Sequence, residues 1–187
     1  MRIVDLSQQF SLEEYARDRH SGTHIDAPAY AFEGAKNVAD FGLERFNRDA
    51  VLLDLSLKKV GQPIDDEDLE AAEECAGLAL RGGEAVILHT YSAEAPSDGR
   101  GNVYLSQNGA EYLEFKSVSL VGVDSASIDN VESTELVAHR TLLSKEILVL
   151  EGLHSLKAID SSRFRLVTFP LRLNGATAPV RAVAILE

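Results

Sequence analysis

The sequence predicts an α/β fold, a mixed β-sheet with flanking helices, in a single domain spanning residues 1–187. Short apolar runs of strand length alternate along the chain with segments of helical periodicity. A length of 187 residues with 45% hydrophobic content is sufficient for one buried core. The chain also contains no internal repeat, low-complexity tract or long linker that would divide it.

The expected strands are short runs rich in Val, Ile and Leu, bounded by turn residues or by helical segments. They cover residues 2–7, 50–57, 84–90, 117–124 and 146–150, with terminal strands at 169–173 and 180–187 around a turn at Gly175–Pro179. All of these runs are too short to cross a bilayer, so no membrane partner is expected.

Helical patterns separate these strands. They cover residues 11–20, 65–80, 105–115 and 133–143. Ser11 and Glu14 have capping-box spacing, so the first helix is expected to begin there and to carry His20 at its end. The second begins with acidic residues and is expected to stop at Gly82-Gly83, and Ser106 is expected to cap the third.

Two intervening segments have turn chemistry. Residues 61–63 (GQP) form a turn, and residues 91–104 form a loop long enough to suggest a functional role. Residues 81–85 (RGGEA) lack the spacing of a glycine-rich phosphate loop.

The net charge and the cysteine content indicate which binding partners and which cellular compartment to expect. Thirty acidic residues against eighteen basic ones give a net charge of −12, which argues against nucleic acid as a partner. Cys75 is the only cysteine and cannot form an internal disulfide, so we interpret it as a small core residue in a reducing compartment. Since the N-terminus lacks the apolar segment of a signal peptide, a cytoplasmic location is expected.

His20, His24 and Asp26 form the most informative cluster of the sequence. Imidazole and carboxylate groups are the ligands that Zn²⁺, Mn²⁺ and Fe²⁺ accept. A helix end that runs into a short extended segment would bring all three side chains together. The spacing differs from that of the zincin helix HExxH, because Ser21 stands where the general-base Glu should be. Judged by spacing alone, the three residues are as consistent with a metal site as with a set of surface or capping groups.

The sequence around this cluster resembles a known family. Residues 20–28 (HSGTHIDAP) resemble the HxGTHxDxP signature of the cyclase-like metal-dependent hydrolases, whose best-understood members are the bacterial kynurenine formamidases (arylformamidases). Residues 120–129 resemble the family's G-x-D-x-x-S-x-D segment, residues 139–153 its H-R-x-L-L … E-N-L block, and residues 170–185 its closing strands. The resemblance covers most of the chain and implies the family's swivelling β/α fold.

The resemblance implies a site for divalent metal, Zn²⁺ or Mn²⁺, with one or two ions per chain. His20, His24 and Asp26 match the ligands of the first ion, with Asp26 bridging. His139 and Glu151 match the ligands of the second. Without the resemblance, His139 would more often be a partly buried helix residue and Glu151 a surface acid.

Tyr30 is where the sequence departs from the family's catalytic pattern. The resemblance implies that bound metal would lower the pKa of water to about 7, so that hydroxide would be available to attack an amide or formyl carbonyl. The family assigns proton delivery to a His two residues after the Pro, and this position is Tyr30. Tyr, with a pKa near 10, can donate a hydrogen bond to a developing oxyanion but is a poor base at neutral pH.

Three interpretations of Tyr30 stay open. Tyr30 donates a proton or hydrogen bond directly, another group such as His89 or His154 shuttles the proton, or the chain binds metal and ligand without fast turnover.

The segment before the signature is the second departure. Residues 7–19 are shorter than the family's Pro/Gly-rich segment, and the chain has no Trp. Aromatic residues that could line a substrate pocket are Phe10, Tyr15, Tyr30 and Tyr91.

The sequence thus predicts a metal-dependent hydrolase that cleaves a C–N bond in a small amide, formamide or cyclic amide. Two alternatives stay open: a non-catalytic metal or small-ligand binding protein on the same fold, and a hydrolase of lactones or other cyclic esters. The expected partner is a small-molecule substrate, and the resemblance suggests a homodimer or homotetramer.

Overall fold

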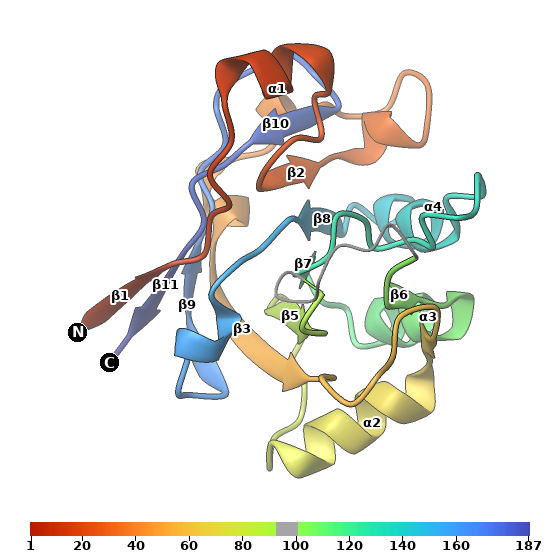
Figure 1. The fold of residues 1–187 in the computed structure, drawn as a ribbon, viewed down its shortest axis with the longest axis vertical. Helices are drawn as coiled ribbons and strands as arrows, with labels where there is room; N and C mark the ends of the chain where they lie inside the picture. Colours follow the sequence, from red (N-terminus) through yellow and green to blue (C-terminus); the bar gives the residue numbers. More distant parts are fainter. Residues whose placement is uncertain (93–100) are drawn as a thin grey trace.

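The computed structural model describes residues 1–92 and 101–187, and a curled mixed β-sheet runs through the centre of the molecule (Figure 1). Its strands are β1 (Arg2–Asp5), β2 (His24–Asp26), β3 (Asn47–Asp54), β5 (Ala85–His89), β7 (Leu120–Val123), β8 (Leu148–Glu151), β9 (Arg163–Val167), β10 (Thr177–Pro179) and β11 (Val183–Leu186). A separate parallel pair consists of β4 (Pro63–Ile64) and β6 (Tyr104–Leu105).

The strand order is β1-β11-β9-β3-β5-β7-β8-β2-β10. The central group of four strands is parallel and consists of β3, β5, β7 and β8. The strands on both sides of this group pair antiparallel with their neighbours. The predicted α/β class with a mixed sheet is therefore confirmed.

Helices cover one face of the parallel strands (Figure 1). The α-helices are α1 (Leu12–Arg17), α2 (Asp66–Cys75), α3 (Gln107–Phe115) and α4 (Val137–Leu143). Short 3₁₀ helices lie at Pro28–Tyr30, Val38–Asp40, Leu43–Phe46 and Leu156–Ala158. α2, α3 and α4 pack on the sheet, and α1 lies apart from them beside β2 and β10. Within the described residues, no helix has both the length and the apolar character needed to cross a membrane.

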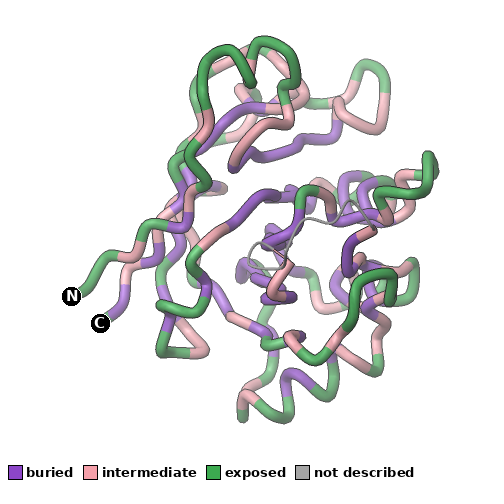
Figure 2. Tube along the Cα trace, viewed as in Figure 1, coloured by how far each residue is buried: buried purple, intermediate pink, exposed green. Residues whose placement is uncertain are grey.

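The central strands are buried on both faces, which produces two hydrophobic clusters (Figure 2). In β5, Val86 and Leu88 point toward the cluster under the helices, while Ala85 and Ile87 point toward the other cluster. The curled sheet itself encloses this second cluster, together with residues such as Phe164 of β9. The alternation follows from the two-residue period of a strand, and a strand buried on both faces has a continuous apolar sequence.

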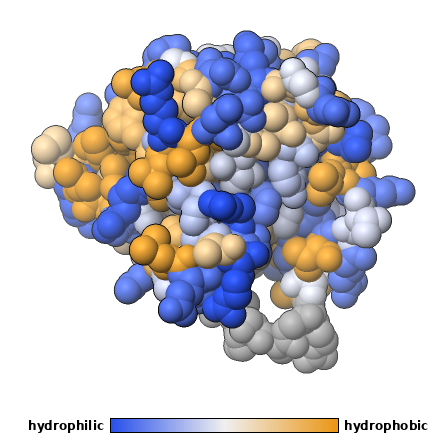
Figure 3. Space-filling view, turned by 90° about the horizontal axis from the view of Figure 1, so that it is seen from above, coloured by the Kyte–Doolittle hydropathy of each residue, from blue (hydrophilic) through white to orange (hydrophobic). Residues whose placement is uncertain are grey.

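On the outside, apolar residues occur among polar ones. Figure 3 looks from the side of α1 and shows hydrophobic groups interspersed with hydrophilic groups over this face. Leu12 and Leu43 are among the exposed apolar residues of the chain. Single exposed apolar residues of this kind are normal on a folded protein.

Several helix ends differ from the prediction. The Ser11 capping box is confirmed, but α1 ends at Arg17, so His20 lies in the turn that follows the helix rather than on it. α2 ends at Cys75 because Gly77 adopts a positive φ of 64°, several residues before the predicted stop at Gly82-Gly83. The interpretation of Cys75 as a core residue is wrong, since it is exposed.

The two later helices agree better. Ser106 caps α3 as predicted, and its hydroxyl accepts a hydrogen bond from the Gly109 N–H. α4 begins at Val137, four residues later than the predicted start at residue 133. Of the predicted loop 91–104, residues 93–100 lie outside the described part of the chain.

The C-terminal segment was predicted correctly only in part: β11 lies within the predicted strand 180–187, but the residues before it differ. Residues 169–173 do not form a strand, and the predicted turn at Gly175–Pro179 contains β10, which pairs with β2. Pro179 is tolerated there because β10 is an edge strand. β9 was missed, although its buried Phe164 and Leu166 alternate with arginines in the pattern of a strand.

Candidate metal centre

Strand pairing brings the first ligand candidates together. β2 lies between β8 and β10, so that His24 is directly opposite Glu151 of β8, and Asp26 is opposite Thr177 of β10. His24 and Asp26 are two residues apart in a strand and therefore face the same side, while Ile25 between them packs into the hydrophobic cluster on the other side.

A tight turn before β2 positions His20. Gly22 has a φ of +72°, and a Cβ at this position would lie 2.1 Å from the ring of Phe10. Glycine is therefore required both for the backbone conformation and for the close approach of Phe10. The turn brings His20 Nδ1 to 3.1 Å from His24 Nε2 and 3.9 Å from Asp26 Oδ1.

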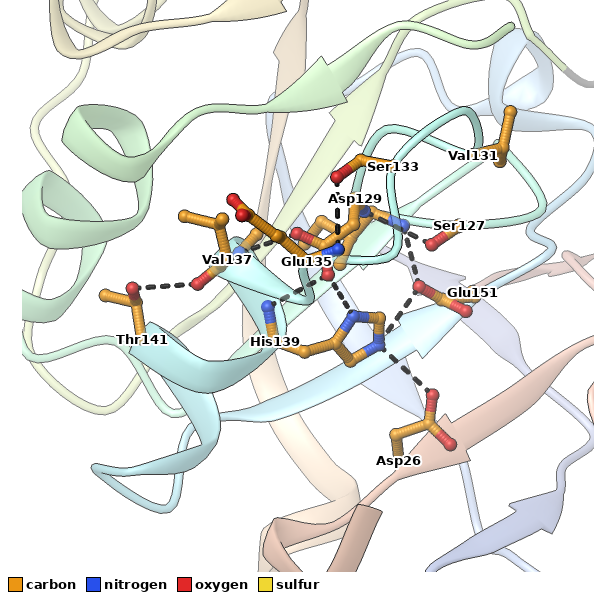
Figure 4. A network of polar contacts seen from close by, with 12 residues as sticks. Asp26, Ser127, Asp129, Val131, Ser133, Glu135, Val137, His139, Thr141 and Glu151 are labelled. Carbon is orange, nitrogen blue, oxygen red and sulfur yellow. Dashed lines mark hydrogen bonds and ion pairs between the residues drawn. The ribbon is translucent and has the colours of Figure 1, made fainter. Parts of the chain in front are cut away.

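His139 approaches the same site from α4 (Figure 4). Its Nε2 lies 3.4 Å from Asp26 Oδ2 and 3.3 Å from Glu151 Oε1, and Glu151 Oε2 lies 3.2 Å from His24 Nε2. The structure thus brings together all five residues that the sequence predicted: His20, His24, Asp26, His139 and Glu151. Their role as metal ligands stays a prediction.

The centre is buried, and its carboxylates dominate its electrostatics. His24, Asp26, His139 and Glu151 are each at most 2% exposed. Burial disfavours a charged imidazole, but the neighbouring carboxylates outweigh it and raise the pKa of His139 to about 10. The pKa of His24 is raised in the same way, against the effect of burial, by Glu151 and Asp26. Two buried carboxylates this close need positive charge, which either protons or a cation would supply.

The donor atoms fit a divalent cation. A ligand atom from each of His20, His24, Asp26 and Glu151 can be chosen so that all lie within 4.8 Å of one another. Asp26 Oδ2 and His139 Nε2 face each other in the buried centre, and neither has a hydrogen bond within the part of the chain that the structure describes, only ion-pair contacts of 3.3 to 3.7 Å. Buried polar atoms normally have partners, and a cation between these two atoms would satisfy both.

Tyr30 lies against this cluster at the end of its short 3₁₀ helix. Its ring centroid is 5.0 Å from that of His20 and 4.8 Å from that of His139. Burial, and then the charges of Asp26 and Glu151, raise the pKa of Tyr30 to about 12. Near neutral pH, its hydroxyl therefore keeps its proton and is able to donate a hydrogen bond.

The other aromatic and histidine candidates lie differently. Phe10 packs over Gly22, and Tyr15 lies beside Phe10 with ring centroids 6.1 Å apart. His89 is buried at the end of β5 and stacks on Tyr91 with centroids 4.3 Å apart. His154 is partly buried just after β8.

Sequence reasoning missed the groups that hold the ligands in place. Asp129 Oδ2 accepts from His139 Nδ1 at 2.6 Å, and Glu151 Oε1 accepts from the Ile128 N–H at 2.7 Å. The Thr177 hydroxyl donates to Asp26 Oδ1. Asp129 is the last Asp of the G-x-D-x-x-S-x-D block, which was the only signal in the sequence that pointed to it.

Comparison with known proteins identifies relatives of this chain. The sequence model of the Cyclase family matches residues 4–130. A kynurenine formamidase of Salinibacter ruber is 33% identical over 168 residues, which cover 88% of this chain and 74% of that protein.

Two solved structures share the fold. Isatin hydrolase A from Labrenzia aggregata has a TM-score of 0.83 at 19% identity. The superposed region covers 98% of this chain and 93% of the isatin hydrolase chain. A potential metal-dependent hydrolase with cyclase activity has a TM-score of 0.80 at 24% identity, with 98% and 96% of the two chains covered.

Proposed function

The chain belongs to the Cyclase family and is an enzyme of the hydrolase kind, and we propose that it uses divalent metal to cleave a C–N bond in a small amide, formamide or cyclic amide. The similarity to a kynurenine formamidase supports an amide-type bond as the target. The similarity to isatin hydrolase A is at the level of the fold.

The observation that carries the proposal is the buried ion pair of Asp26 Oδ2 and His139 Nε2, 3.4 Å apart, whose two atoms have no hydrogen bond to any described residue. His20, His24 and Asp26 would hold one ion, and His139 and Glu151 a second. When bound, such ions supply Lewis acidity and lower the pKa of water enough for nucleophilic attack near neutral pH.

The chain's own groups prepare the site for a cation. The carbonyl of Gly22 accepts from His24 Nδ1 at 2.9 Å, and a carbonyl can only accept, so the proton of a neutral His24 lies on Nδ1 and its lone pair on Nε2. Nε2 is the atom that faces Asp26 and Glu151. Tyr30, with its proton retained, would donate a hydrogen bond to the oxygen of a substrate carbonyl as negative charge develops there.

Metal content tests the first half of the proposal. Protein purified without chelators should contain Zn²⁺ or Mn²⁺ by elemental analysis, and His24→Ala should lower the content because it removes a central ligand. His154→Ala, a histidine outside the cluster, is the matched control and should retain the metal. Wild-type protein free of metal would contradict the site assignment.

A substrate screen tests the second half. Formyl-anilides, cyclic imides and lactones should be offered to the metal-loaded protein, with release of acid as the readout. Hydrolysis of the amides or imides supports the proposal. Turnover of lactones alone would instead make the chain a cyclic-ester hydrolase, and a metal-loaded protein without any turnover would be a binding protein.

A further inference from the structure

Asp129 contacts the side of His139 that faces away from the other ligand candidates (Figure 4). Its Oδ2 accepts from His139 Nδ1 at 2.6 Å, while Nε2 on the opposite edge of the ring faces Asp26 and Glu151. Asp129 itself is only 4% exposed, so water does not compete for this contact.

The same carboxylate also holds the start of α4. Its Oδ1 accepts from the Ala138 N–H at 2.6 Å, and its Oδ2 accepts from the His139 N–H at 3.3 Å. The N-cap position of α4 is Leu136, whose side chain has no acceptor. Asp129 therefore replaces a local cap and fixes the helix turn that carries His139.

The segment around Asp129 is itself fixed. The Asn102 side-chain amide donates to the carbonyls of Ser127 and Asp129 at 2.7 and 2.9 Å. The intervening Ile128 donates its N–H to Glu151 Oε1. Adjacent residues of one loop thus orient two ligand candidates, His139 through a side chain and Glu151 through the backbone.

We propose that Asp129 is a positioning residue that keeps His139 in the tautomer with its proton on Nδ1, so that the Nε2 lone pair faces the metal centre. The inference rests on the metal centre of the proposed function. A carboxylate can accept hydrogen bonds at both oxygens, and Asp129 does so: Oδ1 from Ala138 and Oδ2 from His139. Orienting contacts of this kind typically change metal affinity by about 10–100-fold.

Asp129→Asn separates this role from simple packing. An amide of nearly the same shape accepts at only one end. If its oxygen faces Ala138, its NH₂ faces His139 Nδ1 and favours the wrong tautomer, with the proton on Nε2. If its oxygen faces His139, its NH₂ opposes the Ala138 N–H. Both arrangements disturb the presentation of His139.

The test uses chelator-treated full-length protein titrated with Co²⁺. Visible absorption reports the ligands, and competition with a chromophoric chelator gives the affinity. We expect Asp129→Asn to bind one ion about 10–100-fold more weakly, with an altered spectrum. Asp124→Asn is the matched control, because Asp124 is also a buried carboxylate of this segment but accepts its hydrogen bonds from Thr90. The Co²⁺ spectrum of Asp124→Asn should equal that of wild type. Circular dichroism checks that each metal-free variant is folded.

A measurement on wild type covers the case in which the variant does not fold. In the Zn²⁺-loaded protein, long-range ¹H–¹⁵N correlation should show the His139 proton on Nδ1. A proton on Nε2, or a folded Asp129→Asn variant with wild-type affinity and spectrum, would overturn the role of Asp129 alone. Wild-type protein that binds no divalent ion would overturn the metal centre and this inference with it.

Discussion

Removing the hydroxyl of Tyr30 tests what replaces the family's histidine. Tyr30→Phe deletes one oxygen and keeps the ring that packs between His20 and His139 at centroid distances of 5.0 and 4.8 Å. Folding and metal content should therefore stay at their wild-type values. If the hydroxyl stabilises the developing oxyanion, kcat should fall by about 10²–10³-fold, as for the loss of one oxyanion donor.

The environment of Tyr30 also predicts the pH dependence. Burial and the nearby carboxylates raise its pKa to about 12, and the protonated form is the one that donates. The donor is therefore present at neutral pH and is lost only as the pH rises toward 12. The ratio of wild-type to Tyr30→Phe rates should be constant between about pH 6 and pH 10, since a tyrosine of ordinary pKa near 10 would already ionise there.

The assay is steady-state kinetics on the best substrate from the screen, with metal content and unfolding midpoint measured on the same samples. The conservative ring keeps the packing, so a change in kcat reports the hydroxyl. A parallel Tyr30→His variant should raise the rate on formyl-anilides by about 10²–10⁴-fold if Tyr30 has tuned the site away from general acid–base chemistry.

An unchanged kcat in a folded, metal-loaded Tyr30→Phe variant would refute the reasoning. A ratio of rates that falls steadily from pH 8 upward would refute the pKa argument separately. In the first case the proton donor would be sought at His89 and His154 by alanine substitution.

Two predictions concern stability. Glu73→Gln should lower the free energy of unfolding by about 1.5–3 kcal/mol in urea titrations, because the buried carboxylate accepts from Tyr112 Oη and the Leu80 N–H. These contacts, together with Lys116, hold the pKa of Glu73 below its ordinary value of 4.5 in spite of burial. The stabilisation is therefore complete above pH 4.5 and is lost as the pH falls through the lowered pKa. A loss of unfolding free energy in Glu73→Gln that is the same at all acidic pH values would contradict this pH dependence. Gly109→Ala should destabilise α3 by about 1–3 kcal/mol, although Ala is the better helix former, because its Cβ would lie 2.4 Å from the Ile64 carbonyl oxygen. A higher unfolding temperature for Gly109→Ala would mean that Ile64 can move aside.

The sequence predicted most elements, because their signals are local. Apolar runs specified the central strands, and side-chain caps at Ser11 and Ser106 specified two helix starts. Where a local signal conflicted with pairing, pairing decided the structure. Thr177–Pro179 has turn residues but forms β10, because β2 offers its unpaired edge at that point. The end of α2 depended on Gly77, which adopts the left-handed conformation before the glycine pair that the sequence favoured.

The sequence by itself determined the class of fold and, through the resemblance, which five side chains to expect at the centre. Only the tertiary structure decided how they meet. His24 and Glu151 are distant in the chain and become neighbours through the register of β2 and β8. Likewise, the contact between Asp129 and His139 depends on how a loop and a helix pack. A sequence motif records residue types in order, whereas the direction of a lone pair depends on hydrogen bonds between segments that only folding brings together.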